Sequence, residues 1–126
     1  MTTEQIARVC HDVNAAYCRA IGDNSQTSWA DAFEWQKTSA ISCVLAHIEK
    51  GLTPEESHNA WRAEKLAAGW SYGEKKDPVR LEHPWMIPYG MLPVEQRAKD
   101  YIFGAICTAL IELNLAETAE IEGRIR

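Results

Sequence analysis

The sequence lacks the patterns that mark a membrane protein, a secreted protein or a familiar class of enzyme. No apolar run reaches the length that spans a bilayer, and no basic-then-apolar segment of signal-peptide form opens the chain. A cytoplasmic location is therefore expected. A Gly-rich phosphate loop, a G-x-S-x-G turn and a His-rich zinc pattern are also missing. We accordingly expect neither catalysis nor a cofactor.

An excess of positive charge is lacking as well. The 126 residues include 13 Lys and Arg against 18 Asp and Glu, which gives a formal net charge of -5. A phosphate backbone attracts a basic surface, so this balance argues against a nucleic-acid polymer as the partner. Basic residues are nevertheless grouped between residues 62 and 80, which is compatible with a basic pocket on an acidic body. A chain of this length most simply forms one domain, residues 1–126.

Paired cysteine motifs are absent. Cys10, Cys18, Cys43 and Cys107 show no C-x-x-C spacing and fall at apolar positions of helical patterns. In a reducing compartment such residues are expected to be free, buried thiols. Cys43 and His47 stand one helical turn apart, as two metal ligands can, but no second pair complements them. We expect no metal site.

Helical periodicity accounts for the N-terminal part of the chain. Apolar residues recur at three- and four-residue steps over residues 3–20, which predicts an amphipathic helix that ends near Gly22. His11 points away from this apolar stripe and is expected to be solvated. A second helix, long and largely buried, is expected to begin at a capping-box-like Ser28 and to end at Gly51.

Two further helices follow. Thr53 before a proline is a strong helix start, and this third helix is expected to reach Ala68, with Gly69 just past its end. A fourth helix with a broad apolar face is expected to begin at Pro93. Between them, residues 70–92 show no regular periodicity. The fold class predicted is mainly α, a single compact domain of about four helices with a long ordered loop between the third and the fourth.

The predicted loop is rich in proline and aromatic residues. Its aromatic residues argue against disorder, and a loop of this length in a compact domain is usually functional. A short extended piece is expected near Ser71-Tyr72, or a single helical turn near Pro84–Met86. The loop should fold over the helices and wall off a cleft.

Aromatic, basic and proline residues crowd the window from residue 58 to residue 100. Within the third helix, His58, Trp61 and Lys65 fall on one face. Flat rings beside fixed positive charge can hold a planar, anionic, nucleotide-like ligand. We therefore predict a ligand site formed by Asn14, Tyr17, His58, Trp61, Lys65, Trp70, Tyr72, Lys76, Arg80, His83, Tyr89 and Lys99.

Other interpretations of the same residues stay open. The sequence is equally compatible with Trp61 as an ordinary core anchor and with Lys99 and Asp100 as solvated side chains. His58 and His83 are the only credible acid-base pair, since histidine titrates near neutrality, but His83 precedes a proline and more simply fixes the loop. The aromatic cluster can also be an interface between subunits, because large exposed aromatic residues anchor interfaces.

The same window resembles the RyR domain, a module named for its repeats in ryanodine receptors that also occurs in small bacterial and phage proteins. The resemblance covers residues 54–113. It rests on His58, Trp61, Lys65, Gly69-Trp70, Tyr72-Gly73, Lys76-Asp77, His83-Pro84, Pro88-Tyr89, Leu92 and Lys99-Asp100. The segment from Val13 to Cys18, Trp29 and the stretch from Glu34 to Gln36 further resemble stand-alone phage-type members.

The resemblance implies a biochemical role of limited detail. The family is proposed to sense or bind nucleotide-derived small ligands, and no reaction is associated with it. A protein of this kind is expected to sequester a nucleotide signal, as a phage protein does to blunt host immunity in the host cytoplasm, or to report the signal by changing its assembly as a homo-oligomer. The alternative expectation is a protein-interaction module that uses the aromatic cluster as its interface.

Overall fold

The protein is mainly helical, as the sequence predicts. The structure, a computed structural model, describes the backbone of residues 1–125, with all of their side chains except those at 116, 119, 121, 124 and 125. The main elements are α1 (Thr3–Ala20), α2 (Glu34–Lys50), α3 (Pro54–Ala67) and α4 (Val94–Ile125), with short strands β1 (Ser71–Tyr72) and β2 (Glu82–His83) and 3-10 turns at Trp29–Asp31 and Tyr89–Met91. Among the helices of residues 1–125, none combines the length and the apolar character needed to cross a bilayer.

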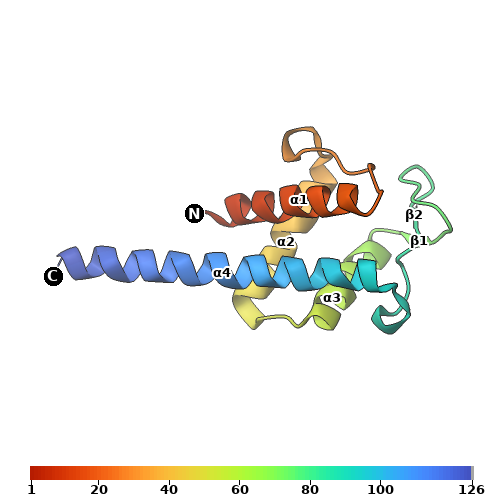
Figure 1. Ribbon diagram of the computed structural model, residues 1–126. Helices are drawn as coiled ribbons and strands as arrows, with labels where there is room; N and C mark the ends of the chain where they lie inside the picture. Colours follow the sequence, from red (N-terminus) through yellow and green to blue (C-terminus); the bar gives the residue numbers. More distant parts are fainter. Residues whose placement is uncertain (126) are drawn as a thin grey trace.

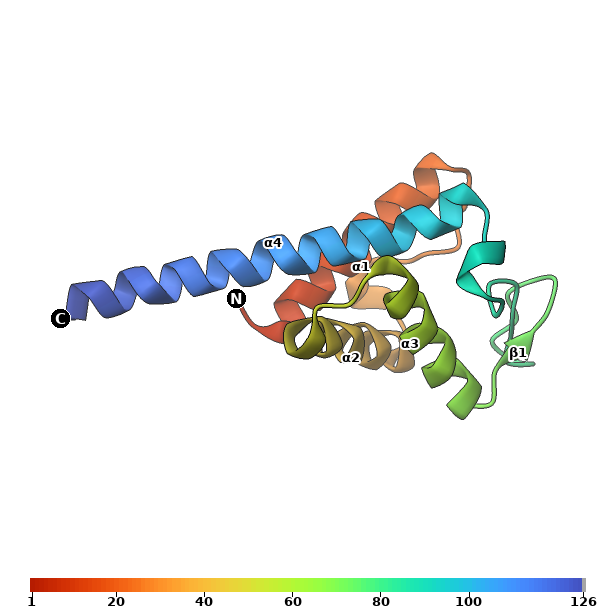
Figure 2. The ribbon, with the colours of Figure 1, turned by 90° about the horizontal axis from the view of Figure 1, so that it is seen from below.

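Three of the helices enclose the core. α1 and α4 run side by side in opposite directions, and α2 crosses behind both of them (Figure 1). α3 packs against α2 and α4 (Figure 2). The segment with β1 and β2 lies at one end of the molecule, beside the start of α4, whereas the C-terminal part of α4 projects beyond the body at the other end. The core residues are Ile6, Ala7, Cys10, Trp29, Val44 and Cys107.

Local capping fixes the ends of α1 and α3 where the sequence predicts them. The Thr53 hydroxyl accepts from the Glu56 backbone N–H at 3.2 Å, and the Glu56 carboxylate accepts from the Thr53 N–H at 3.0 Å. This reciprocal pair satisfies two donors that a helix start leaves without partners. After α3, Gly69 adopts a φ of +92°, a conformation that glycine takes without steric cost. α1 has an equivalent capping box and ends next to Gly22.

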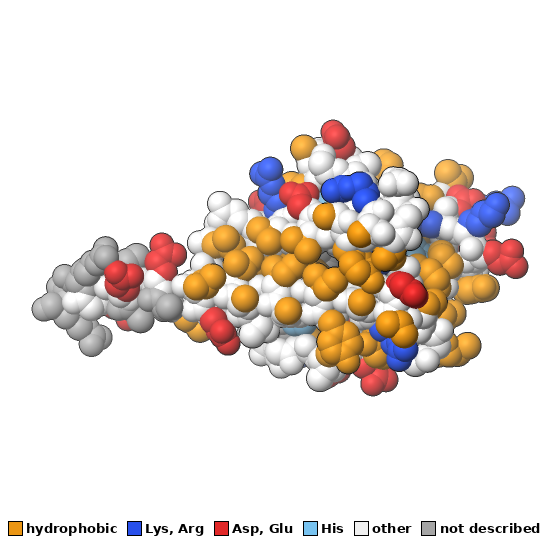
Figure 3. Space-filling view, viewed as in Figure 1, with side chains coloured by type: hydrophobic (Ala, Val, Ile, Leu, Met, Phe, Trp, Pro, Cys, Tyr) orange, Lys and Arg blue, Asp and Glu red, His pale blue; other side chains and the backbone are white. Residues whose placement is uncertain are grey.

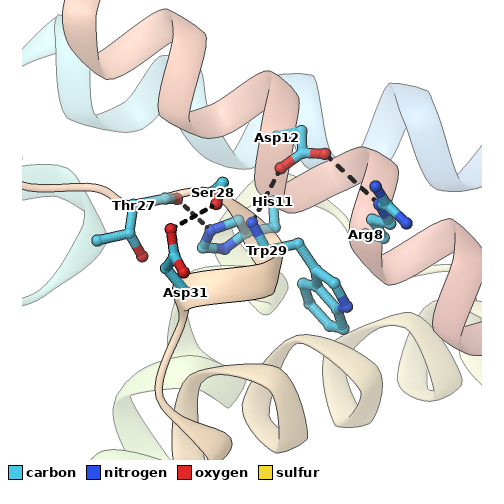
Figure 4. Close-up of polar contacts among 7 residues, drawn as sticks. All are labelled: Arg8, His11, Asp12, Thr27, Ser28, Trp29 and Asp31. Atoms are coloured by element: carbon cyan, nitrogen blue, oxygen red, sulfur yellow. Dashed lines mark hydrogen bonds and ion pairs between the residues drawn. The ribbon is translucent and has the colours of Figure 1, made fainter.

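The beginning of α2 differs from the prediction. The Ser28 hydroxyl contacts the Asp31 carboxylate at 3.3 Å and caps no backbone N–H, and a 3-10 turn at Trp29–Asp31 precedes the helix proper. Ala32 and Phe33 are extended, so α2 begins only at Glu34. The reason is tertiary: the Trp29 side chain is in the core, and the backbone N–H of Trp29 donates to the Asp12 carboxylate of α1 at 3.3 Å (Figure 4).

His11 is only partly exposed, whereas the sequence-based expectation was a solvated side chain. Its Nε2 lies 2.7 Å from the Thr27 carbonyl oxygen, and its ring meets the Trp29 ring edge-on at 5.7 Å (Figure 4). The face of α1 that periodicity marks as outward is covered here by the segment that connects α1 to α2. Because this covering is a contact between distant residues, helical spacing alone does not predict it.

Two of the predicted apolar faces are less buried than expected. In α2, Leu45 and Ile48 are exposed, whereas Val44 and His47 face the core. α4 begins one residue after Pro93, and its Tyr101 is 64% exposed. α4 packs on the body along one side only, so the broad apolar face predicted for it is partly uncovered. All four cysteines are free thiols; Cys10, Cys18 and Cys107 are buried as predicted, whereas Cys43 is half-buried.

The segment between α3 and α4 is ordered by its own hydrogen bonds. β1 and β2 pair in parallel, with Ser71 opposite Glu82, which confirms the extended piece predicted there. The Asp77 carboxylate accepts from the backbone N–H groups of Val79 and Arg80, at 3.0 and 3.1 Å, and so closes the turn between the strands. The short helical turn lies at Tyr89–Met91, five residues later than the position predicted.

Candidate functional site

A cavity of about 250 Å³ lies where the loop after α3 meets the helices. Every major helix contributes to its wall, together with β2 and the residues around the strands. Its aromatic lining comprises His11, Trp35, His58, Trp61, Trp70, His83, Trp85 and Phe103. Its charged lining comprises Lys65, Lys76, Lys99 and Asp100, and its amide side chains are Asn14, Gln26, Gln36 and Gln96.

Most of the residues predicted for the ligand site meet at this cavity. Eight of them line it: Asn14, His58, Trp61, Lys65, Trp70, Lys76, His83 and Lys99. The row of His58, Trp61 and Lys65 on one face of α3 is present as predicted, and α4 brings Lys99 to the same space. The structure thus joins residues that are up to 85 positions apart in the chain, from Asn14 to Lys99.

The other four predicted residues lie outside the cavity lining. The Tyr17 hydroxyl donates to the Glu95 carbonyl at 2.7 Å, which ties α1 to the first turn of α4. Tyr72 is 57% exposed in β1. Arg80 is exposed and forms a long contact with Asp77 (4.0 Å), and Tyr89 stands behind His58, with ring centroids 6.0 Å apart.

Lys65 is the most unusual group in the lining. The residue is only 6% exposed, and its ammonium lies 4.2 Å from the centroid of the Trp35 ring and 5.5 Å from that of Trp70. Within the part of the chain that the structure describes, no ion pair or hydrogen bond is made by this ammonium. Burial lowers the pKa of Lys65, while the Glu64 carboxylate acts in the opposite direction. A cation buried without an anion costs free energy, which the two ring faces offset only in part.

Two further lysines add positive charge to the same space. Burial lowers the pKa of Lys76; the Asp23 carboxylate opposes this, and the Lys99 ammonium adds to it. The interaction between Lys76 and Lys99 is a repulsion between like charges across the cavity. An anion bound between the lysines would relieve that repulsion and the desolvation of Lys65 together.

The rings form a connected series along one wall. His58 stacks on Trp61, with ring centroids 5.6 Å apart, and Trp61 meets the edge of His83 at 5.0 Å. Trp70 follows at 6.3 Å from His83, and Trp35 at 5.4 Å from Trp70. Trp61 is therefore surrounded by rings and cavity, which differs from the aliphatic setting of an ordinary core anchor. Such a wall offers flat faces to a planar ligand.

His83 acts in the loop as a hydrogen-bond acceptor. Its Nδ1 accepts from the Trp85 backbone N–H at 3.1 Å, which confirms the prediction that this histidine fixes the loop. Burial, followed by the charges of Lys76 and Lys99, lowers the pKa of His83 to about 4. The ring is therefore neutral at physiological pH. Its partner in the acid-base interpretation, His58, has its Nε2 2.8 Å from the Ile87 carbonyl oxygen.

Two other titratable groups line the cavity. Burial raises the pKa of the Asp100 carboxyl to about 7, and the Lys99 charge acts in the opposite direction. Burial also raises the pKa of the Cys43 thiol to about 12, so the nucleophilic thiolate is scarce at neutral pH. Among the described residues, no group of three or more His, Cys, Asp and Glu side chains is arranged to hold a metal ion.

The sequence-based prediction missed several cavity residues. Trp35 and Gln36 were noted in the resemblance but were not assigned to the site, and Trp85 was counted only as a loop aromatic. Asp100 was noted in the resemblance and was otherwise interpreted as a solvated residue. For Trp35 the missing information is the docking of α2 on α3, which places its ring against Lys65. The signal in the sequence was the resemblance of the stretch from Glu34 to Gln36 to stand-alone members of the family.

Fold and cavity together define a class: a mainly helical domain in which an aromatic loop closes a cavity lined by tryptophan and lysine. A family model described as the RyR domain matches residues 36–111, which is more than half of the chain. The protein belongs to the RyR domain family. The match spans α2, α3, the loop and the first half of α4, whereas α1, which supplies His11 and Asn14 to the cavity, precedes it.

Proposed function

We propose that this protein binds a small, anionic, nucleotide-derived molecule in the cavity and performs no chemical reaction on it. The observation that carries the proposal is Lys65, a buried ammonium without an anionic partner among the described residues, held between the rings of Trp35 and Trp70. A phosphate group would supply the missing charge. Charge-assisted hydrogen bonds from ammonium to phosphate are short and strong.

The composition of the cavity supports a ligand with both a charged and a flat part. Lys65, Lys76 and Lys99 outnumber the single carboxylate of Asp100. The aromatic wall that begins at Trp61 offers stacking, which contributes roughly 1–3 kcal/mol per base in single-strand nucleic-acid sites. The volume of about 250 Å³ is close to the lower end of small-molecule pockets. One nucleotide unit suits that space better than a polymer.

A role in binding also agrees with the chemistry of the lining. A nucleophilic site needs an activated nucleophile beside a base. The Cys43 thiol, whose pKa burial raises to about 12, is poorly activated. The His83 ring, whose pKa burial lowers to about 4, already accepts a hydrogen bond from the backbone. The use we propose is sequestration of a nucleotide signal, as in phage counter-defence within a host cytoplasm; sensing through a change in assembly is the other use.

Calorimetry and thermal shift test the proposal directly. The panel consists of nucleoside mono- and diphosphates, cyclic nucleotides, inorganic phosphate and an uncharged nucleoside. We expect nucleotides to bind and to raise the melting temperature, whereas the nucleoside should bind weakly. Lys76→Ala should weaken nucleotide binding at least about tenfold, because it removes a charge-assisted contact. The matched control is Lys75→Ala, an exposed lysine outside the cavity lining.

A flat response across the whole panel would count heavily against nucleotide binding. Equal losses in Lys76→Ala and Lys75→Ala would also contradict the pocket, because only the first of these side chains lines the cavity. Loss of affinity in Lys76→Ala with unchanged secondary structure by circular dichroism is the supporting result.

A second candidate function, assembly with another copy of the chain, is favoured by a different surface. Apolar side chains form a broad band over α1 and α4 on the face seen in Figure 3, with charged groups mainly at its edges. Exposed apolar residues on these helices include Val13 (39%), Val94 (68%), Tyr101 (64%) and Leu113 (64%). The aromatic residues of the cavity give less support to an interface, since Trp70 is only 6% exposed.

A second copy is the partner that we propose for this band. Two adjacent helices about 10 Å wide, the shorter about 27 Å long, cover roughly 500 Å² or more on each copy. Two such faces together approach the lower limit of stable interfaces, about 1,200 Å². Light scattering coupled to size-exclusion chromatography should detect a dimer that Tyr101→Glu dissociates and that Lys65→Met leaves intact. A monomer at all concentrations up to about 100 μM would rule out a dimer of micromolar affinity.

A further inference from the structure

Asp100 is the one lining residue whose charge opposes the binding of an anion. It lies in α4 next to Lys99, and both residues line the cavity. Its carboxyl forms neither a hydrogen bond nor an ion pair with any residue that the structure describes, although Lys65 and Lys76 line the same space. A carboxyl group that lines the same cavity as lysines without pairing with them has its acceptor oxygens free for a ligand.

The chemistry of a carboxylate limits what it can recognise. An ionised carboxylate only accepts hydrogen bonds, so it repels phosphate and favours N–H donors. In direct readout of bases, Asp and Glu accept from the exocyclic amino group of cytosine. A ligand that places its phosphate by the lysines and an amino group at Asp100 would satisfy both parts of the cavity.

The side chain one turn before Asp100 extends this polar edge. Gln96 lies four residues earlier on α4, which places it on the same face, and it also lines the cavity. An amide group offers both donors and an acceptor, so it can complement the ring nitrogen or carbonyl beside an amino group. The aromatic wall with Trp61 lies in the same cavity and can contact the face of the base, while Gln96 and Asp100 of α4 form hydrogen bonds with its edge.

We propose that Asp100 makes the cavity selective for nucleotides whose base carries an exocyclic amino group, such as adenine or cytosine, over bases with a carbonyl at the same position. This selectivity rests on the proposed nucleotide binding. Asp100 is thereby a specificity-determining residue, which accepts a hydrogen bond from the base, while Lys65, Lys76 and Lys99 contact the anionic group. A carbonyl at that position would face the carboxylate with two acceptors opposed, which costs affinity.

Ionisation of Asp100 gives the selectivity a pH dependence. Burial raises the pKa of its carboxyl to about 7, with the Lys99 charge in opposition. The other titratable groups of the lining are Lys99 from α4, Lys65 and His58 from α3, Lys76 from the loop, His83 from β2, Cys43 from α2, and Cys10 and His11 from α1. Of these, Cys43 stays protonated and His83 stays neutral between pH 6 and pH 8, because burial moves their pKa values to about 12 and about 4.

Selectivity for amino bases should therefore rise with pH. The ionised fraction of a carboxyl with a pKa of about 7 grows about tenfold between pH 6 and pH 8. The ratio of affinities for cytidine and uridine monophosphate isolates this effect, because the phosphate group is common to both and its own titration cancels. Adenosine and inosine monophosphate form a second pair, which again differs by an amino group against a carbonyl.

The test measures these four nucleotides and inorganic phosphate by calorimetry at pH 6 and pH 8. At pH 8 we expect the nucleotide with the amino base to bind about tenfold more tightly than its carbonyl counterpart, in each pair whose bases fit the cavity. At pH 6 this preference should be smaller. Asp100→Asn should bring the preference to within about twofold and should bind inorganic phosphate more tightly, since a negative charge is lost. Glu95→Gln, which removes an exposed carboxylate of the same helix outside the lining, should behave like the wild type.

The outcomes separate this inference from the function on which it rests. If the nucleotides bind but both pairs show equal affinities in the wild type, Asp100 does not select the base and the nucleotide site stands. A preference that survives in Asp100→Asn overturns the inference in the same way. If neither nucleotides nor phosphate bind the wild type, the proposed function fails and the selectivity fails with it. The pH comparison uses the wild type alone and does not depend on the folding of Asp100→Asn: a preference that does not rise between pH 6 and pH 8 overturns the inference.

Discussion

Replacing Lys65 by Met separates the stability of the empty protein from its affinity for an anion. Lys65 is 6% exposed, and methionine keeps most of the unbranched stem that packs against Trp35 and Trp70. The substitution removes an ammonium whose desolvation costs several kcal/mol. It also removes cation–π contacts with two rings, each contributing about 0.5–2 kcal/mol. We expect a net gain of about 1–3 kcal/mol in the free energy of unfolding.

The same substitution should impair the ligand site. A hydrogen bond to a charged group contributes about 1.5–3 kcal/mol, so the affinity for nucleotide or inorganic phosphate should fall about 10- to 100-fold. Denaturant unfolding at pH 7 measures the first effect, and calorimetry measures the second. A gain of stability coupled to a loss of affinity is the pattern of a group retained for binding at a cost to the fold.

The matched control is Lys75→Met, which removes an exposed lysine with the same change of side chain. It should alter stability by no more than about 0.5 kcal/mol and should leave affinity unchanged. The reasoning about Lys65 is refuted if Lys65→Met destabilises the protein and leaves anion affinity intact. Lys65 would then be a structural residue held by its two tryptophans.

Three further predictions test the structure around the cavity. Tyr17→Phe removes the hydrogen bond to the Glu95 carbonyl and should lower stability by about 0.5–1.5 kcal/mol in denaturant unfolding. Nucleotide affinity should not change, and a large loss of affinity would show that Tyr17 belongs to the ligand site. Thr53→Ala removes the N-cap of α3 and should cost about 1 kcal/mol, whereas Thr53→Ser should cost little; equal losses in both would argue against the cap. In the ligand-free protein, burial holds the pKa of Asp100 at about 7, above its unfolded value, so its contribution to stability is present below about pH 4 and is lost as the pH rises to about 7. Relative to the wild type, the free energy of unfolding of Asp100→Asn should therefore rise by about 1–3 kcal/mol between pH 4 and pH 7. A difference in stability that does not change with pH would contradict the burial of this carboxyl.

The parts of the fold that the sequence predicted are those decided by neighbouring residues. Thr53 and Glu56 satisfy each other's backbone across three residues, and Gly69 relieves a local steric conflict. The bounds of α3 were predictable for this reason. The alignment of His58 with Lys65 on one face follows equally from helical geometry, because the spacing alone places them there.

Predictions failed where a distant contact decides the outcome. α2 begins at Glu34 because Trp29 enters the core and donates to Asp12, two contacts with α1 that a local pattern does not contain. His11 is covered for the same reason. Tyr17, which we predicted for the ligand site, has its hydroxyl on the Glu95 carbonyl at the start of α4 and lies outside the cavity lining.

The amino-acid sequence by itself determined the family, the helical class and the chemical types available for a site, since periodicity, caps and residue identity are properties of short stretches of chain. Only the tertiary structure decided which of those residues share one cavity. Docking of α2 on α3 sets Trp35 against Lys65, and the start of α4 adds Asp100 to a space otherwise lined by lysine and aromatic rings. The physical reason is burial: the charge of Lys65 and the ionisation of Asp100 become unusual only when distant segments exclude water from them.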